Sequence, residues 1–215
     1  MNDRSWRVRR LCVIAVLCAM AYVAVAIIRI PVVSFLKYEP KDVLLVMGGF
    51  MFGPLIGALM GVTVGLLELV TVSDTGFIGL IMNVISTCLF VCTASAIYQR
   101  KKNIFGAVSG LVVGILLMTA GMLLWNYLIT PLYLEISREA VTQMLLPVFL
   151  PFNLFKGTLN AAFAMLLYKP LRSALRATRL MPPASTEQSD RKNYVWLIAL
   201  FIIATLFGVL QLWGG

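Results

Sequence analysis

The stretch VLLVMGGFMFGPLIGALMGVTVGLLELV, residues 43 to 70, decides how many helices this chain contains. It is apolar almost throughout, but Gly53 and Pro54 interrupt it near the middle. A membrane-spanning helix needs about 20 apolar residues, because each residue rises ~1.5 Å and the hydrocarbon core is ~30 Å thick. The stretch is longer than one ordinary span, and glycine followed by proline turns or kinks a helix. It therefore predicts either two short helices or one bent helix.

Composition places the whole chain in the membrane. Hydrophobic residues make up 60% of the sequence and charged residues only 13%, which is unlike a soluble globular domain. Further apolar runs long enough to form helices in the membrane cover residues 11–28, 79–98, 104–133, 147–168 and 194–213. The chain is therefore predicted to be an all-α integral membrane protein.

The first apolar run, residues 11–28, follows the basic segment RSWRVRR, so a signal peptide is a competing interpretation. A retained helix is favoured because the run is long and no convincing small-residue cleavage site precedes the segment IRIPVVSFLKYEPKD.

The basic residues favour two helices within residues 43–70. Cytoplasmic loops concentrate Lys and Arg, and a tight turn at Gly53 and Pro54 brings most of the 18 basic residues to one face of the membrane. A single bent helix would scramble this separation. The residues that gather on that face are Arg4, Arg7, Arg9, Arg10, Arg100, Lys101, Lys102, Lys169, Arg172, Arg176, Arg179, Arg191 and Lys192.

The predicted organisation is a six-helix body over residues 1–172, a polar cytoplasmic linker over 173–193 and an additional transmembrane helix over 194–215. The protein is expected to cross the cell membrane several times, with a cytoplasmic N-terminus and an external C-terminus. The net charge of +9 then follows from topology and needs no nucleic-acid partner, although the basic loops can contact anionic lipid.

Residues that would supply energy or catalysis are missing from the sequence. There is no GxxxxGK[ST] phosphate-binding loop, no histidine, and no pairing of a nucleophile with a base or of metal ligands. Glu68 is the one carboxylate within a predicted span, and its place near the helix end favours a solvated residue over an ion-coupling one. A binding role without enzymatic activity is expected.

A polar stripe in the run 147–168 marks the candidate binding site. Asn153, Lys156, Gly157 and Asn160 stand at i, i+3, i+4 and i+7, which places them along one side of a helix. A lysine exposed to lipid at the membrane centre costs ~2.5–3.5 kcal/mol, so the stripe should face protein or a water-filled cavity. The alternatives are that Lys156 extends to the membrane surface or pairs with Glu68.

Asn126 is the second candidate, because it lies between Trp125 and Tyr127 in the outer part of its helix. Amide groups beside flat aromatic rings and a lysine suit a planar, mostly uncharged heterocycle whose edge carries carbonyl and N–H groups. An anionic group could also be attracted to Lys156.

The sequence resembles the substrate-binding S components of energy-coupling-factor (ECF) transporters, and specifically their riboflavin-binding members. The likeness covers residues 8 to 172. It lies in the first helix and in the blocks YEPKDVLLVMGGFMFGPLIGAL, WNYLITPLY and LLPVFLPFNLFKGTLNAAFAMLLYKPL.

The resemblance implies a six-helix subunit that captures riboflavin from the external side. It also implies an ECF module of one transmembrane coupling protein and two ATPase subunits as partner. Asn126, Asn153 and Lys156 correspond to residues that bind the flavin ring, and the loop around Tyr38, Glu39 and Pro40 to a lid that lines the site. An AxxxA pattern at Ala15 and Ala19 corresponds to the surface that docks on the coupling protein.

Two other functions remain open from the sequence. Another vitamin, or the phosphorylated flavin FMN, would keep the fold and change only the pocket. A stand-alone ion-coupled secondary transporter would need Glu68 or another group to carry the ion. The additional helix at 194–215 is not part of the six-helix family pattern.

Overall fold

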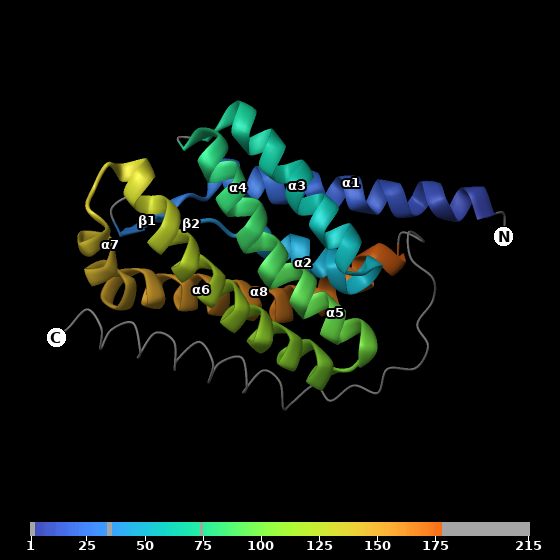
Figure 1. Cartoon of the computed structure of the whole chain (residues 1–215). Coiled ribbons are helices and arrows are strands. Elements are labelled where there is room, and N and C mark those ends of the chain that lie inside the picture. Colours follow the sequence, from blue (N-terminus) through green and yellow to red (C-terminus); the bar gives the residue numbers. More distant parts are fainter. Residues whose placement is uncertain (1–2, 34–35, 74, 178–215) are drawn as a thin grey trace.

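The computed structural model describes residues 3–33, 36–73 and 75–177 (Figure 1). Residues 173–177, the start of the predicted linker 173–193, continue the last described helix, which ends at Ala177; residues 178–193 of that linker and the predicted helix at 194–215 lie outside the described residues.

The described chain forms six helical rods. The π-helical turns η1 (Cys88–Cys92) and η2 (Leu145–Phe149) join α4 to α5 and α7 to α8, so that each pair continues as one rod. The number of helices predicted for the body is therefore confirmed. The α-helices are α1 (Asp3–Ile27), α2 (Lys41–Phe52), α3 (Pro54–Thr71), α4 (Gly76–Thr87), α5 (Thr93–Arg100), α6 (Ile104–Leu134), α7 (Arg138–Met144) and α8 (Leu150–Ala177).

The break between α2 and α3 occurs at the residues that the sequence indicated. Gly53 ends α2 with φ 101°, a backbone conformation that costs glycine little and other residues more. Pro54 is the first residue of α3, where its missing N–H is not needed by the helix. The stretch 43–70 is thus two helices joined by a tight turn.

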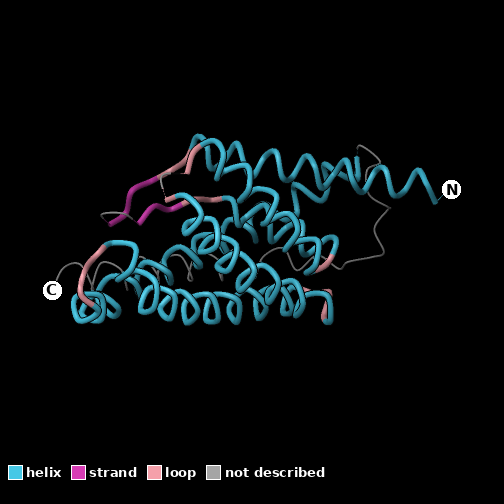
Figure 2. Tube along the Cα trace, turned by 45° about the horizontal axis from the view of Figure 1, so that its top comes forward, coloured by secondary structure: helices cyan, strands magenta, loops and turns pink. Residues whose placement is uncertain are grey.

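A short antiparallel hairpin between α1 and α2 was not predicted. Strand β1 (Ile30–Val33) pairs with β2 (Leu36–Tyr38), with Ile30 opposite Tyr38. The hairpin lies at the end of the bundle opposite the N-terminus, near α7 (Figure 1), and Figure 2 shows its strands beside the helices. The described parts of the segment between the first two helices, residues 28–33 and 36–40, therefore lie against the bundle.

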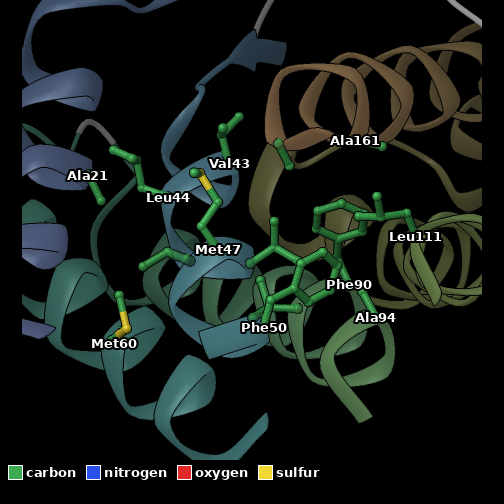
Figure 3. Close-up of a cluster of buried hydrophobic side chains, with 14 of the residues drawn as sticks. Ala21, Val43, Leu44, Met47, Phe50, Met60, Phe90, Ala94, Leu111 and Ala161 are labelled. Carbon is green, nitrogen blue, oxygen red and sulfur yellow. The ribbon is translucent and has the colours of Figure 1, made fainter. Parts of the chain in front are cut away.

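Helix α2 is the centre of the bundle. Every residue from Lys41 to Phe50 is buried, and α2 packs against α1, α3, α5 and α8. Figure 3 shows α2 side chains such as Met47 and Phe50 surrounded by residues of neighbouring helices, including Met60 and Phe90. A helix enclosed by protein can be shorter than the bilayer is thick, and α2 has only 12 residues.

Four helical segments of the described chain are long and apolar enough to cross a membrane: Trp6–Ile27, Pro54–Thr71, Gly76–Arg100 and Ile104–Leu134. Helix α2 is too short, and α8 carries the polar stripe of Asn153, Lys156 and Asn160. The polar residues of α8 and the charged start of α2 are buried by the surrounding helices. The multi-pass membrane character predicted from composition is confirmed.

Three side-chain hydrogen bonds bring the ends of several helices together. Arg10 of α1 donates to the carbonyl of Phe52 over 3.4 Å, and Gln99 of α5 donates to the carbonyl of Phe50 over 2.8 Å. The hydroxyl groups of Tyr98 and Tyr168 lie 2.6 Å apart. The start of α1, the α2–α3 turn, the end of α5 and the later part of α8 therefore share one end of the molecule, away from the hairpin (Figure 1).

Gly110 on α6 provides a stability test of the bundle. A Cβ at this position would lie 2.6 Å from the carbonyl oxygen of Ala94 on α5, which is backbone and cannot rotate away. Gly110→Ala is expected to lower the thermal unfolding temperature in detergent clearly, although alanine favours helix. In the matched change Gly65→Ala the added Cβ meets side chains instead of backbone, the flexible end of Leu80 at 3.0 Å and Val84 at 3.5 Å, so the effect should be smaller. Equal unfolding temperatures for the two variants would contradict this packing.

Candidate functional site

A cavity of about 300 Å³ opens between α3, α4, α6 and α8 at the hairpin end of the bundle. Residues of the hairpin and of the segment after it also line the cavity, including Lys37 and Glu39. The volume is at the lower end of the ~300–1,000 Å³ that is usual for sites of small organic ligands. The hairpin thus closes one side of a space that the helices leave between them.

Asn126, Asn153 and Lys156, predicted from separate parts of the sequence, all line this cavity. Asn126 is held at both ends of its amide: Nδ2 donates to the Met122 carbonyl over 2.7 Å, and Oδ1 accepts from the Thr130 hydroxyl over 2.8 Å. Each amide group has further bonding capacity, because Nδ2 carries a second hydrogen and Oδ1 a second lone pair. The side chain is therefore fixed before a ligand arrives.

Asn153 is anchored in the same way within α8. Its Nδ2 donates to the carbonyl of Phe149 over 2.7 Å, and the residue is buried. The bond leaves the amide oxygen as an acceptor that a ligand N–H or O–H can use. Two oriented amides from two helices thus share one cavity.

Lys156 is buried beside a carboxylate and does not extend to the membrane surface. Its Nζ lies 4.0 Å from Oδ2 of Asp42 at the start of α2, and only 7% of Lys156 is exposed. Asp42 is fully buried and accepts a hydrogen bond from the Thr87 hydroxyl over 2.7 Å. The alternative pairing of Lys156 with Glu68 does not occur; Glu68 pairs with Lys41.

The rest of the polar stripe on α8 faces protein. Asn160 is fully buried and accepts a hydrogen bond from the Tyr38 hydroxyl over 2.9 Å. A Cβ at Gly157 would lie 3.1 Å from Ile115 and 3.0 Å from Met118, so a side chain there would press on α6. The prediction that the stripe avoids lipid is confirmed, and only Asn153 and Lys156 of the stripe line the cavity.

The three residues predicted for a lid have different positions. Glu39 lines the cavity and pairs with Arg29 at 3.2 Å and with Lys41 at 3.3 Å. Tyr38 is buried against Phe155, with ring centroids 6.1 Å apart, and does not line the cavity. Pro40 is half-buried and precedes α2 without lining the cavity. The segment is anchored to the bundle through Tyr38 and Glu39.

The surroundings of this segment shift the pKa of the Glu39 carboxyl and the pKa of the Tyr38 hydroxyl. Burial alone would raise the pKa of Glu39, but the positive charges of Lys41, Lys156 and Arg29 outweigh burial and lower it below 4.5. Burial, together with the negative charge of Asp42, raises the pKa of the Tyr38 hydroxyl. Glu39 therefore stays charged at neutral pH, and its stabilising contribution is lost only as the pH falls through the lowered pKa.

The interpretation of Glu68 as a solvated residue is wrong. Only 2% of Glu68 is exposed; its Oε2 accepts from Lys41 Nζ at 2.6 Å and from Asn83 Nδ2 at 3.4 Å. Lys41 and Asp42, at the start of α2, are likewise buried, with 2% and 0% of each residue exposed. Their burial follows from the position of α2 inside the bundle, and no local sequence signal distinguishes them from a solvated charged pair at a helix start.

The two aromatic neighbours of Asn126 lie in different surroundings in the structure. Trp125 lines the cavity with Asn126, as expected for a ring that contacts a ligand. Tyr127 is on the outside of the bundle, where the guanidinium of Arg138 lies 5.4 Å from the centre of its ring. One of the two aromatic residues therefore belongs to the candidate site.

Ala15 and Ala19 lie on the exposed face of α1. Their neighbours Val13, Leu17 and Ala21 point into the bundle and are nearly inaccessible. The side of α1 that carries the AxxxA pattern is therefore uncovered, next to exposed Val16 and Met20. Small residues four apart permit close contact with another helix.

Comparison with known proteins connects this geometry to a family. A family model described as "ECF transporter, substrate-specific component" matches residues 9–168. A protein named riboflavin transporter RibU from Streptococcus thermophilus is 29% identical over 178 residues, which cover 78% of this chain and 84% of that protein. A protein of the same name from Staphylococcus aureus is also 29% identical, with 78% and 93% covered.

A solved structure described as "Structure and mechanism of the S component of a bacterial ECF transporter" has a similar fold. Its TM-score with this chain is 0.67 at 27% sequence identity, and the match covers 79% of this chain and 99% of the other. The described fold is therefore shared with nearly the whole length of that chain.

Proposed function

Because this chain belongs to the substrate-specific S components of ECF transporters, we propose that its substrate is riboflavin, bound in the cavity between α3, α4, α6 and α8. Members of this family are transporter subunits that work with an energising ECF module, and they are not enzymes. The observation that carries the proposal is that Asn126, Asn153 and Lys156 line one cavity. The relatives named riboflavin transporter support the same substrate.

The chemistry of the cavity suits the flavin ring. Trp125 and the apolar residues Met122 and Phe152 offer surfaces for the faces of a flat ring. Carbonyl and N–H groups alternate along one edge of the flavin, and the two oriented amides can pair with them as donors and acceptors. The Lys156 ammonium adds a charged donor, which strengthens a hydrogen bond to a carbonyl or ring nitrogen.

The direction of capture is inferred from the charges. Basic segments at the start of α1 and between α5 and α6 lie at the end of the bundle away from the cavity, and Lys and Arg concentrate on the cytoplasmic side of membrane proteins. The cavity then faces the external side. We infer that the exposed face of α1 with Ala15 and Ala19 docks on the coupling protein, and that two ATPase subunits supply the energy.

Riboflavin titration of the detergent-purified protein tests the substrate. Flavin fluorescence should be quenched as riboflavin enters a cavity beside Trp125, and the titration should saturate at one riboflavin per chain. Biotin and thiamine, which lack the flavin ring, should not compete. Absence of saturable quenching, or equal competition by an unrelated vitamin, would contradict the assignment.

Dependence on partners is tested in liposomes. The chain alone, with a proton or sodium gradient and no ATPase subunits, should bind riboflavin without accumulating it inside. Accumulation driven by the gradient would instead support an ion-coupled transporter, with buried Glu68 as the first candidate to carry the ion.

A further inference from the structure

The cavity has a second polar wall that the flavin ring does not explain. Glu68 of α3 and Asn83 and Ser86 of α4 line it, together with Ser73 and Thr75 near the α3–α4 connection. These side chains are carboxylate, amide and hydroxyl groups, and the two cations beside them are already paired: Lys41 with Glu68, and Arg29 with Glu39. The wall of α6 and α8 combines amides with the Lys156 ammonium.

Glu68 has one oxygen for which the fold supplies no donor. Its Oε2 is occupied by Lys41 and Asn83, whereas Oε1 is buried and has no hydrogen-bond partner among the described residues. A buried carboxylate oxygen without a donor is costly, and such groups are usually satisfied by water or a ligand. Because Glu68 lines the cavity, the missing donor can come from a bound molecule.

Among the residues that the structure describes, the buried and half-buried charges around the cavity pair with each other. Arg29 pairs with Glu39, Lys41 with Glu39 and Glu68, and Lys156 lies beside Asp42. Three cations thus meet three carboxylates. Lys37, the remaining charged residue of the lining, is exposed. A ligand phosphate near Glu68 would therefore meet a carboxylate, with no surplus buried cation in the described part of the chain to compensate, which is unfavourable.

We propose that Glu68, with Asn83 and Ser86, forms a subsite for the hydroxyl groups of the ligand's sugar-alcohol chain, and that Glu68 makes the cavity select riboflavin over FMN. This inference rests on the proposed function, since riboflavin carries such a chain and FMN carries the same chain with a phosphate. The hydroxyl groups donate to Oε1 of Glu68, while Asn83 and Ser86 provide further donors and acceptors.

The test compares three flavins on the Glu68→Gln variant of the full chain. Lumiflavin has the flavin ring with a methyl group in place of the sugar-alcohol chain. Because a hydrogen bond to a charged acceptor is lost, riboflavin should bind about tenfold more weakly. The variant should bind lumiflavin with an affinity within about twofold of the wild-type affinity, because lumiflavin has no sugar-alcohol chain and so loses no hydrogen bond to Glu68. The affinity for FMN relative to riboflavin should rise.

Glu139→Gln is the matched control, because Glu139 is an exposed carboxylate on α7 and its replacement should change none of the three affinities. Ser86→Ala repeats the lumiflavin comparison without altering charge, and serves if the Gln variant does not fold. Equal weakening of riboflavin and lumiflavin, or an unchanged preference over FMN, would overturn the subsite while leaving riboflavin binding by the wild type intact. Failure of the wild type to bind any flavin would overturn the proposed function itself.

Discussion

Replacing Lys156 or Asn153 with alanine is expected to weaken riboflavin binding more than tenfold while the protein still inserts into the membrane. A hydrogen bond to the charged Lys156 contributes about 1.5–3 kcal/mol, and removing the neutral Asn153 amide leaves a buried ligand group unpaired at a cost of about 1–3 kcal/mol. Each 1.4 kcal/mol is about a factor of ten in affinity. Lys156 is the cavity's ammonium donor on α8, and Asn153 is an amide one turn before it. Riboflavin fluorescence quenching measures the affinities.

The control for this experiment is Lys102→Ala, because Lys102 is exposed in the turn between α5 and α6, away from the cavity. Lys156→Ala leaves Asp42 buried without its cation, so a loss of affinity could come from a loss of structure. The unfolding temperature of the unliganded variant separates the two causes. Affinities close to wild type in both Lys156→Ala and Asn153→Ala would exclude this wall as the ring site.

Replacing Lys41 with methionine is expected to lower the free energy of unfolding by about 3–5 kcal/mol, the usual cost of breaking a buried ion pair by removing one partner. Lys41 is 2% exposed and bridges Glu39 at 3.3 Å and Glu68 at 2.6 Å. Its removal leaves Glu68 without its cation inside the bundle. Unfolding of the ligand-free protein in detergent measures the loss.

A second replacement distinguishes the ion pair from simple packing of Lys41. In the variant that combines Lys41→Met with Glu68→Leu, both charges of the closer pair are gone, and most of the lost stability should return, because apolar residues can replace a buried pair at little cost. Glu39 keeps Arg29 as its partner in this variant. A loss below 1 kcal/mol in the single variant, or no recovery in the double one, would contradict the role of the pair.

The helical framework could be predicted from local sequence because its causes are local. Apolar runs indicate spans, and Gly53 followed by Pro54 breaks the long run at residues 43–70. The polar stripe on α8 was likewise visible from helical spacing alone. The hairpin of β1 and β2 was missed, because its strands are only four and three residues long and are held against the bundle by contacts such as Tyr38 with Asn160.

The ion pairs of the site could not be predicted, because they join residues far apart in the chain. Lys41 pairs with a carboxylate 27 residues away, and Tyr38 bonds to a residue 122 positions away. A charged pair such as Lys41 and Asp42 before an apolar helix is normally solvated, and here it is buried because α2 lies inside the bundle. Burial of a helix end depends on the packing of all its neighbours, which a single sequence does not display.

A structure of this protein with riboflavin bound tests the proposed flavin site most directly. We expect ring density against Trp125 within hydrogen-bonding distance of Asn126, Asn153 and Lys156, with the sugar-alcohol chain directed toward Glu68. Ring density outside the cavity, or in the cavity without contact to these three residues, would contradict the central claim that this wall recognises the flavin.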